Sequence, residues 1–122
     1  MYSISEISEK VDISAHTLRY YEKEGIIDPI RNEHGVRQFN EQHLKWLQFV
    51  KKLRETQMPV SQIKEYTRLF LEGEHTANAR LKLLEDHQQF IRDQIETLLA
   101  TDEMLSKKIS TYKKLMEKSL LK

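Results

Sequence analysis

Cysteine is absent from this chain of 122 residues, and glycine and proline occur only three times and twice. The absence of cysteine excludes disulfides, thiolate metal ligands, cysteine nucleophiles and thiol sensors. Few turn-forming residues, combined with 32% charged residues, favour long helices with few connections. The composition therefore predicts a mostly α chain, either one compact domain or a small domain that carries an extended element.

Long apolar runs are missing as well. No stretch reaches the roughly 18 apolar residues that a membrane span needs, and the N-terminal sequence lacks the charged-then-apolar layout of a secretion signal. We therefore expect a cytoplasmic protein with no membrane partner. The formal net charge of +1 is uninformative, but residues 14–54 carry eight basic and five acidic residues, a weak indication of an anionic partner.

Motifs for enzyme or metal chemistry are also lacking. The sequence contains no glycine-rich phosphate loop, paired carboxylate motif or serine–histidine arrangement, and its five histidines show no i, i+4 ligand spacing. We therefore expect no catalytic residues, no metal site and no cofactor.

Two short helices are predicted at the N-terminus. Residues 3–6 have the S-x-x-E form of a capping box, so a first helix begins near Ser3 and ends before residues 12–13. Ser14 then caps a second helix, which Gly25 can end in the left-handed conformation. Two helices this short and this close in sequence indicate a helix-turn-helix unit.

A ribbon and a second helix pair follow. Pro29 excludes a continued helix, and turn-forming residues between strand-compatible ones predict a two-stranded ribbon with its tip at residues 33–35. Asn40 caps a third helix with a regular apolar stripe. The sequence around Pro59 interrupts that helix and starts a fourth, which Gly73 ends.

The rest of the chain has a heptad repeat. Counted from Leu81, apolar residues occupy four of six a positions and five of six d positions. At about 1.5 Å per residue, this stripe extends roughly 50 Å to Met116, and no second long helix in the chain can cover it. The pattern therefore predicts a homodimer. The alternatives are a helix that folds back over its own domain, or one that breaks near Asp102 into a hairpin.

The second helix presents polar side chains that can bind nucleic acid. Those on or beside its predicted outer face are His16, Thr17, Arg19, Tyr20, Tyr21 and Lys23. A cation, hydroxyls and an imidazole can donate hydrogen bonds to phosphate oxygens and base edges, and the helix N-terminus near Ser14 favours a phosphate. From these residues alone, an ordinary solvated helix face is an equally good interpretation.

The order of elements resembles the MerR family of transcriptional regulators along the whole chain. The resemblance rests on the segments "TLRYYEKEGII", "HGVRQF" and "HLKWLQFVKKLRETQMPVSQIKEY", followed by the heptad helix. It implies a winged helix-turn-helix DNA-binding domain with the second helix pair at residues 1–73, and a dimerisation helix at 76–118 that forms an antiparallel coiled coil in a dimer. Residues 119–122 would be a tail.

The family resemblance also implies a function. A homodimer would bind a pseudo-palindromic operator in double-stranded promoter DNA, distort the spacer and act on RNA polymerase indirectly. The protein would be bacterial, cytoplasmic and nucleoid-associated. An alternative from another class is a coiled-coil adaptor whose winged domain binds a protein partner.

Site residues follow from the resemblance by position. Residues 14–24 would form the recognition helix, and the expected DNA-binding residues are Ser14, His16, Thr17, Arg19, Tyr20, Tyr21, Arg31 and Arg37. Within the tyrosine pair, Tyr21 is the expected phosphate ligand and Tyr20 is expected to pack partly. The wing departs from the family where Val36 replaces the usual tyrosine, so one phosphate contact is lost unless Gln38 supplies it.

An unknown small-molecule effector is a further expectation. It would lie in a groove between the heptad helix and the third and fourth helices, near Trp46, Tyr66, Phe70 and His75. The competing and favoured interpretation is that these aromatic residues only form an interdomain core.

Overall fold

The computed structural model describes residues 1–121 and the side chains of residues 1–120. The chain divides into two units, Met1–Leu84 and Glu85–Lys122. The first unit contains all the short elements and also the start of the long helix, whereas the predicted domain boundary lies at residues 73–76. No helix within the described residues is long and apolar enough to cross a membrane.

The predicted helix-turn-helix is formed by α1 (Ile4–Val11) and α2 (Ala15–Lys23). α1 begins with the expected capping box, in which the Ser3 hydroxyl accepts a bond from the Glu6 amide and the Glu6 carboxylate accepts one from the Ser3 amide. The side chain of Ser14 caps α2 in the same way, without the return bond. Short local signals therefore set both helix starts.

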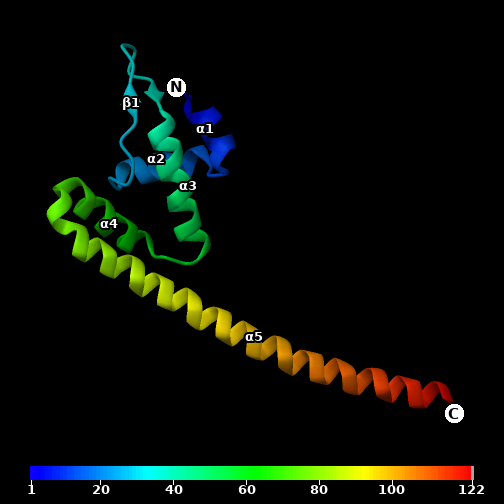
Figure 1. The fold of residues 1–122 in the computed structure, drawn as a ribbon. Helices are drawn as coiled ribbons and strands as arrows, with labels where there is room; N and C mark the ends of the chain where they lie inside the picture. The colour runs from blue at the N-terminus through cyan, green and yellow to red at the C-terminus, as the bar shows by residue number, and fades with distance from the viewer. Residues whose placement is uncertain (122) are drawn as a thin grey trace. The chain divides into compact units, whose positions relative to one another are not determined.

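The predicted ribbon is present as β1 (Ile30–Arg31) and β2 (Arg37–Gln38), which pair antiparallel with Arg31 opposite Arg37. The Asn32 side chain accepts hydrogen bonds from the amides of His34 and Val36 and so builds the turn at the tip. Figure 1 shows the ribbon extending away from α1 to α3. This arrangement is a wing, and the name is used below for residues 30–38.

One strand contact was not predicted. Tyr2 forms an isolated antiparallel bridge with Phe39, with hydrogen bonds of 2.7 and 2.8 Å in the two directions. The Tyr2 hydroxyl also bonds to Glu41. The N-terminal segment is thereby attached to the base of the wing.

The second helix pair consists of α3 (Glu41–Glu55) and α4 (Val60–Glu72). Asn40 caps α3 as predicted, and His43 completes a capping box because its Nδ1 accepts the Asn40 amide at 2.9 Å. The His43 Nε2 lies 2.9 Å from the carbonyl oxygen of Asp28 and attaches the start of α3 to the segment before β1.

The core of the first unit collects apolar residues from the helices α1 to α4 and from the segments between them. The fully or almost fully buried ones are Ile7, Leu18, Ile26, Phe39, Leu47, Val50, Met58 and Ile63. Each such side chain stabilises the fold by about 1.5–3 kcal/mol through its removal from water. This core fixes the backbone that carries α2 and the wing.

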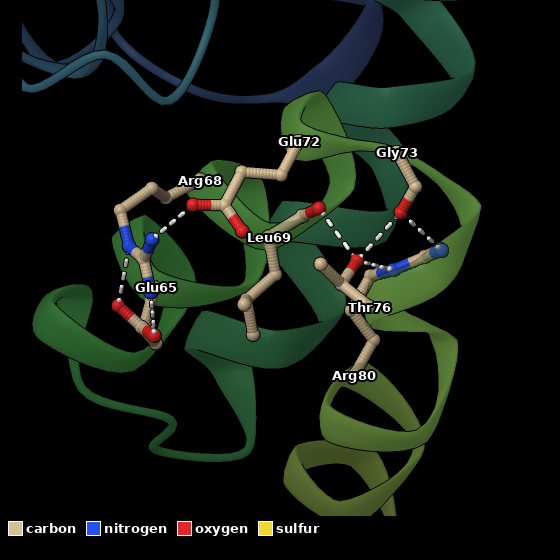
Figure 2. Close-up of polar contacts among 7 residues, drawn as sticks. All are labelled: Glu65, Arg68, Leu69, Glu72, Gly73, Thr76 and Arg80. Atoms are coloured by element: carbon tan, nitrogen blue, oxygen red, sulfur yellow. Dashed lines mark hydrogen bonds and ion pairs between the residues drawn. The ribbon is translucent and has the colours of Figure 1, made fainter.

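A network of hydrogen bonds joins α4 to the next helix through the short helix η1 (Glu74–Thr76), as Figure 2 shows. The buried Thr76 hydroxyl donates to the Leu69 carbonyl oxygen at 2.6 Å and accepts from Arg80 Nε at 3.0 Å. Gly73, the predicted end of α4, has φ 127°, a conformation that favours glycine. The network satisfies carbonyl groups that a helix end leaves unpaired.

The last helix, α5 (Ala77–Leu121), is continuous through Asp102, so the alternative of a hairpin is wrong. Its 45 residues correspond to about 68 Å. The predicted heptad stripe is exposed at Ile95, Leu98 and Leu105, whose exposed fractions are 51%, 68% and 49%. A stripe this long and this apolar needs a partner helix.

Candidate nucleic-acid interface

The outer face of α2 carries most of the predicted polar side chains. His16, Arg19, Tyr20 and Lys23 are exposed, whereas Leu18 turns into the core. Among the described residues, Arg19 has no hydrogen bond or ion pair, so its guanidinium donors are free for a ligand. The spacing of i, i+3 and i+4 places these groups on one side of a helix that the core holds in place.

The two tyrosines of α2 differ strongly in exposure. Tyr21 is 5% exposed and belongs to the core, whereas Tyr20 is 43% exposed. Tyr20 is thus partly packed, and the phosphate contact expected of Tyr21 stays a prediction that depends on its hydroxyl alone. The physical reason for the difference in exposure is that α2 docks through the face of Leu18 and Tyr21, which lie three residues apart, and Tyr20 falls about 100° to the side of Tyr21.

The Tyr21 hydroxyl nevertheless reaches the surface. It has no hydrogen bond within the described residues, and no buried side-chain oxygen or nitrogen there lacks a partner, so the hydroxyl retains contact with solvent. Tyr21 lines a hollow of about 230 Å³ together with Ser14, Thr17 and Lys51. Hydroxyls and an ammonium at a helix N-terminus are suitable donors for a phosphate.

The Ser14 side chain forms hydrogen bonds within the first turn of α2. Its oxygen accepts the Thr17 amide at 3.1 Å, and its hydroxyl donates to the Thr17 hydroxyl at 2.9 Å. Both hydroxyls are thus oriented at the first turn of α2.

The two arginines of the wing share one carboxylate on α2. Arg31 Nη2 lies 2.8 Å from Glu22 Oε2, and Arg37 Nε lies 2.5 Å from Glu22 Oε1. The hydrogen bond from Arg37, with a further one from Arg31, lowers the pKa of Glu22 below its ordinary value, although partial burial opposes this. The wing is therefore fastened to α2 by two ion pairs.

A third ion pair holds the C-terminal end of α2. Lys64 on α4 lies 2.6 Å from Glu24, which is the C-cap residue of α2. The hydrogen bond with Lys64 lowers the pKa of Glu24, and the same bond raises the pKa of Lys64. α2 is thus fixed to both the wing and the second helix pair.

The four residues predicted near an effector do not form one site. Trp46 stacks on Tyr66 with ring centroids 6.0 Å apart, and Trp46 and Phe70 line a hollow of about 480 Å³. Tyr66 and His75 do not line this hollow, and His75 is exposed. The remaining lining comes from α3, α4 and the segment after α2, so the hollow is not in the expected groove against the heptad helix.

Sequence reasoning missed three charged residues of this region. Glu22 binds the wing arginines, Lys64 binds the C-cap residue of α2, and Lys51 on α3 binds Asp12, the C-cap residue of α1. Glu22 stands in the quoted segment "TLRYYEKEGII", and this position was the only available signal. The partners of Lys51 and Lys64 are about forty residues away in sequence, and no local pattern connects them.

The fold and this surface define a winged helix-turn-helix protein. Residues 2–69 match the family described as MerR HTH family regulatory protein, and residues 44–108 match the one described as MerR, DNA binding. The chain belongs to the MerR family of HTH regulatory proteins. The recognised family and the expected winged helix-turn-helix architecture are confirmed.

Individual relatives agree with this assignment. The HTH-type transcriptional regulator AdhR of Bacillus subtilis is 38% identical over 88 residues, which are 71% of this chain and 63% of the relative. The match therefore spans less than two thirds of that relative's length. The relative is named a transcriptional regulator, which does not favour the alternative of a protein-binding adaptor.

Two solved structures have the same fold. A Listeria monocytogenes protein described as a candidate MerR family transcriptional regulator is 37% identical, with a TM-score of 0.86 over 92% of this chain and 86% of that one. HiNmlR, a MerR family regulator lacking the sensor domain and solved bound to promoter DNA, is 34% identical, with a TM-score of 0.84 over 93% of this chain and 90% of that one.

Proposed function

We propose that this protein regulates transcription as a homodimer that binds a pseudo-palindromic promoter operator. In each copy, α2 enters the major groove and the wing contacts the flanking phosphates. The observation that carries the proposal is the exposed face of α2, with its free Arg19 beside an arginine-bearing wing, in a chain whose structural neighbour HiNmlR was solved on promoter DNA. The protein would act in the bacterial cytoplasm, without catalysis.

The dimer is supported by α5. Its exposed apolar residues continue the heptad stripe over the second unit, as at Ile109, Tyr112 and Met116, which are 52%, 58% and 59% exposed. A second copy of the same helix, antiparallel to the first, would cover this stripe. Two copies then present two recognition helices and two wings to one duplex, which matches a palindromic site.

Deformation of the operator is part of the proposal. Four contact elements on one duplex, two helices and two wings, can offset the energy of bending and unwinding the spacer between half-sites. RNA polymerase then responds to the altered spacer without contact with the regulator.

The proposal is tested by selecting bound sites from a random-sequence duplex pool with the purified protein. The expected result is an inverted repeat, bound with an affinity that falls steeply with salt because phosphate contacts release counterions. Little binding to any duplex at low salt would contradict the proposal and would favour a protein-binding module instead.

The recognition helix is tested by Arg19→Ala. Loss of a base contact should weaken operator binding by about 1–3 kcal/mol and relax specificity at one position. Loss of a phosphate contact alone should weaken binding to all sequences alike. The matched control is Arg68→Ala on α4, because Arg68 is engaged with Glu65 and Glu72 (Figure 2) and should leave operator affinity unchanged.

A small-molecule effector site is a second, separate proposal. The hollow lined by Trp46 and Phe70, of about 480 Å³, has the size of a small-molecule site, and Ile26, Ile27 and Leu71 make it largely apolar. A change in Trp46 fluorescence on titration with a small apolar compound, lost in Phe70→Ala, would support it.

A further inference from the structure

Glu22 lies between two cations that the ribbon places directly opposite each other. In the register of β1 and β2, Arg31 pairs with Arg37, so both side chains project from the same face of the wing. Like charges directly opposite on neighbouring strands destabilise the pair. One Glu22 oxygen binds each arginine, and this shared carboxylate removes the repulsion.

The two arginines differ in the nitrogens that they use. Arg31 donates from Nη2 to Glu22 and from Nη1 to the carbonyl oxygen of Gly35 at 2.9 Å, so both its terminal nitrogens are engaged within the protein. Arg37 uses only Nε for Glu22. Its two terminal nitrogens, with four N–H donors, have no partner among the described residues.

The two arginines are distinguished by which of their nitrogens are engaged, and not by how exposed their side chains are. The Arg31 side chain is the more exposed, at 46% against 27% for Arg37. However, the bond from Arg31 to Gly35 closes the tip of the wing, whereas the bond from Arg37 Nε leaves its planar fork of terminal nitrogens for a bidentate bond to a phosphate.

We infer that Glu22 is a positioning residue of the wing, which holds Arg37 with its terminal nitrogens free to bind a DNA phosphate, while Arg31 closes the wing tip. The inference rests on the proposed function and adds a division of labour between the two arginines. It has an unusual consequence. Removal of the negative charge of Glu22 beside DNA weakens binding, because this carboxylate positions the arginine that binds a DNA phosphate.

The test compares Glu22→Gln with Glu33→Gln, a matched variant that removes the same charge from the exposed wing tip. Within the described part of the chain, the Glu33 carboxylate forms an ion pair only with His34, at 3.5 Å. Binding is measured to a duplex of about 30 base pairs, roughly three helical turns, over a range of salt concentrations. We expect Glu33→Gln to bind as tightly as the unaltered protein or more tightly, and Glu22→Gln to bind about tenfold more weakly.

The division of labour is tested by Arg37→Gln and Arg31→Gln on the same duplex. Each phosphate contact contributes about 0.9 to the slope of log affinity against log salt, and the dimer has two wings. Arg37→Gln should therefore reduce the slope by roughly two, and Arg31→Gln by less than half as much. Equal slope changes in the two variants would overturn the assignment.

Amide hydrogen exchange without DNA provides an independent measurement. The Asn32 amide donates to Val36 and the Gly35 amide to Asn32 within the wing tip. Glu22→Gln and Arg31→Gln should speed exchange at both amides, while Glu33→Gln should not. Unchanged exchange in Glu22→Gln would overturn the positioning role even if the protein binds DNA.

Failure of this inference can be distinguished from failure of the proposed function. If the unaltered protein binds no duplex at low salt, the proposed function is wrong and this inference with it. If the unaltered protein binds but Glu22→Gln behaves like Glu33→Gln, only the inference is wrong. Should Glu22→Gln fail to fold, as judged by circular dichroism, the surface variants of Arg31 and Arg37 still decide the assignment.

Discussion

The same kind of apolar periodicity is buried in one unit of this chain and exposed in the other. In Met1–Leu84, helical stripes meet one another, and Leu47 and Ile63 are 0% exposed. In Glu85–Lys122, the stripe of one helix has no facing element among the described residues, and Leu98 and Met116 are 68% and 59% exposed. Periodicity therefore predicts a buried face in both units. In the first unit, other elements of the same chain cover that face. In the second unit, no described element of the chain covers it.

The largest expected effect comes from the closed core. Leu47→Ala should reduce the free energy of unfolding by about 2–5 kcal/mol, because it leaves a cavity at a fully buried site. The matched control is Leu71→Ala on α4, where the side chain is 75% exposed and the loss should stay within about 0.5 kcal/mol. Urea unfolding at several protein concentrations measures both, and equal losses would contradict the assigned core.

A leucine-to-alanine substitution in the second unit should instead weaken the association of two copies. Leu98→Ala removes a d-position side chain from the proposed dimer interface, and we expect a loss of about 1–3 kcal/mol that appears as weaker dimerisation. Sedimentation over a concentration series measures it. Lys107→Ala, at the heptad position opposite the stripe, is the control. A monomer with unchanged unfolding at all concentrations would remove the basis for the dimer.

A smaller effect is expected at the start of α2, the proposed recognition helix. Ser14→Ala removes the cap of α2 and should reduce the stability of the first unit by about 1 kcal/mol. The control is Ser5→Ala, because Ser5 is an exposed residue within α1. It tests whether the loss of any helix serine lowers the stability. Thermal unfolding compares the two, and equal shifts would argue against the cap.

The smallest effect is the pH dependence of the first unit. The pKa values of Glu22 and Glu24 are lowered by their cationic partners, so the folded chain takes up protons at these groups less readily than the unfolded chain. Their contribution is present above about pH 4.5 and is lost as pH falls through the lowered values. Glu24→Gln should flatten the decline of Tm in this range, and an unchanged decline would contradict the role of the Lys64 ion pair.

Local signals in the sequence predict much of the fold. The capping box at Ser3, the caps at Ser14 and Asn40 and the turn before Val36 each depend on residues within four positions of one another. Interactions over such short distances in sequence are readable because the chain has few ways to satisfy them differently.

The candidate site was only partly predictable. Its elements and exposed polar residues follow from the pattern, but the orientation of α2 within them does not, because two adjacent aromatic residues offer the core equivalent choices. The Glu22 ion pairs and the bridge of Tyr2 to Phe39 join residues 9 to 37 positions apart. Only the packed backbone brings such groups together.

By itself, the sequence determined the order of helices and ribbon, the heptad stripe and the family to which they belong. These depend on local hydrogen bonds and periodicity, which act along the chain. The tertiary structure alone decided that Tyr21 enters the core while Tyr20 stays outside, and that one carboxylate serves both arginines of the wing. Those choices depend on close packing and charge geometry, which exist only once distant segments lie against each other.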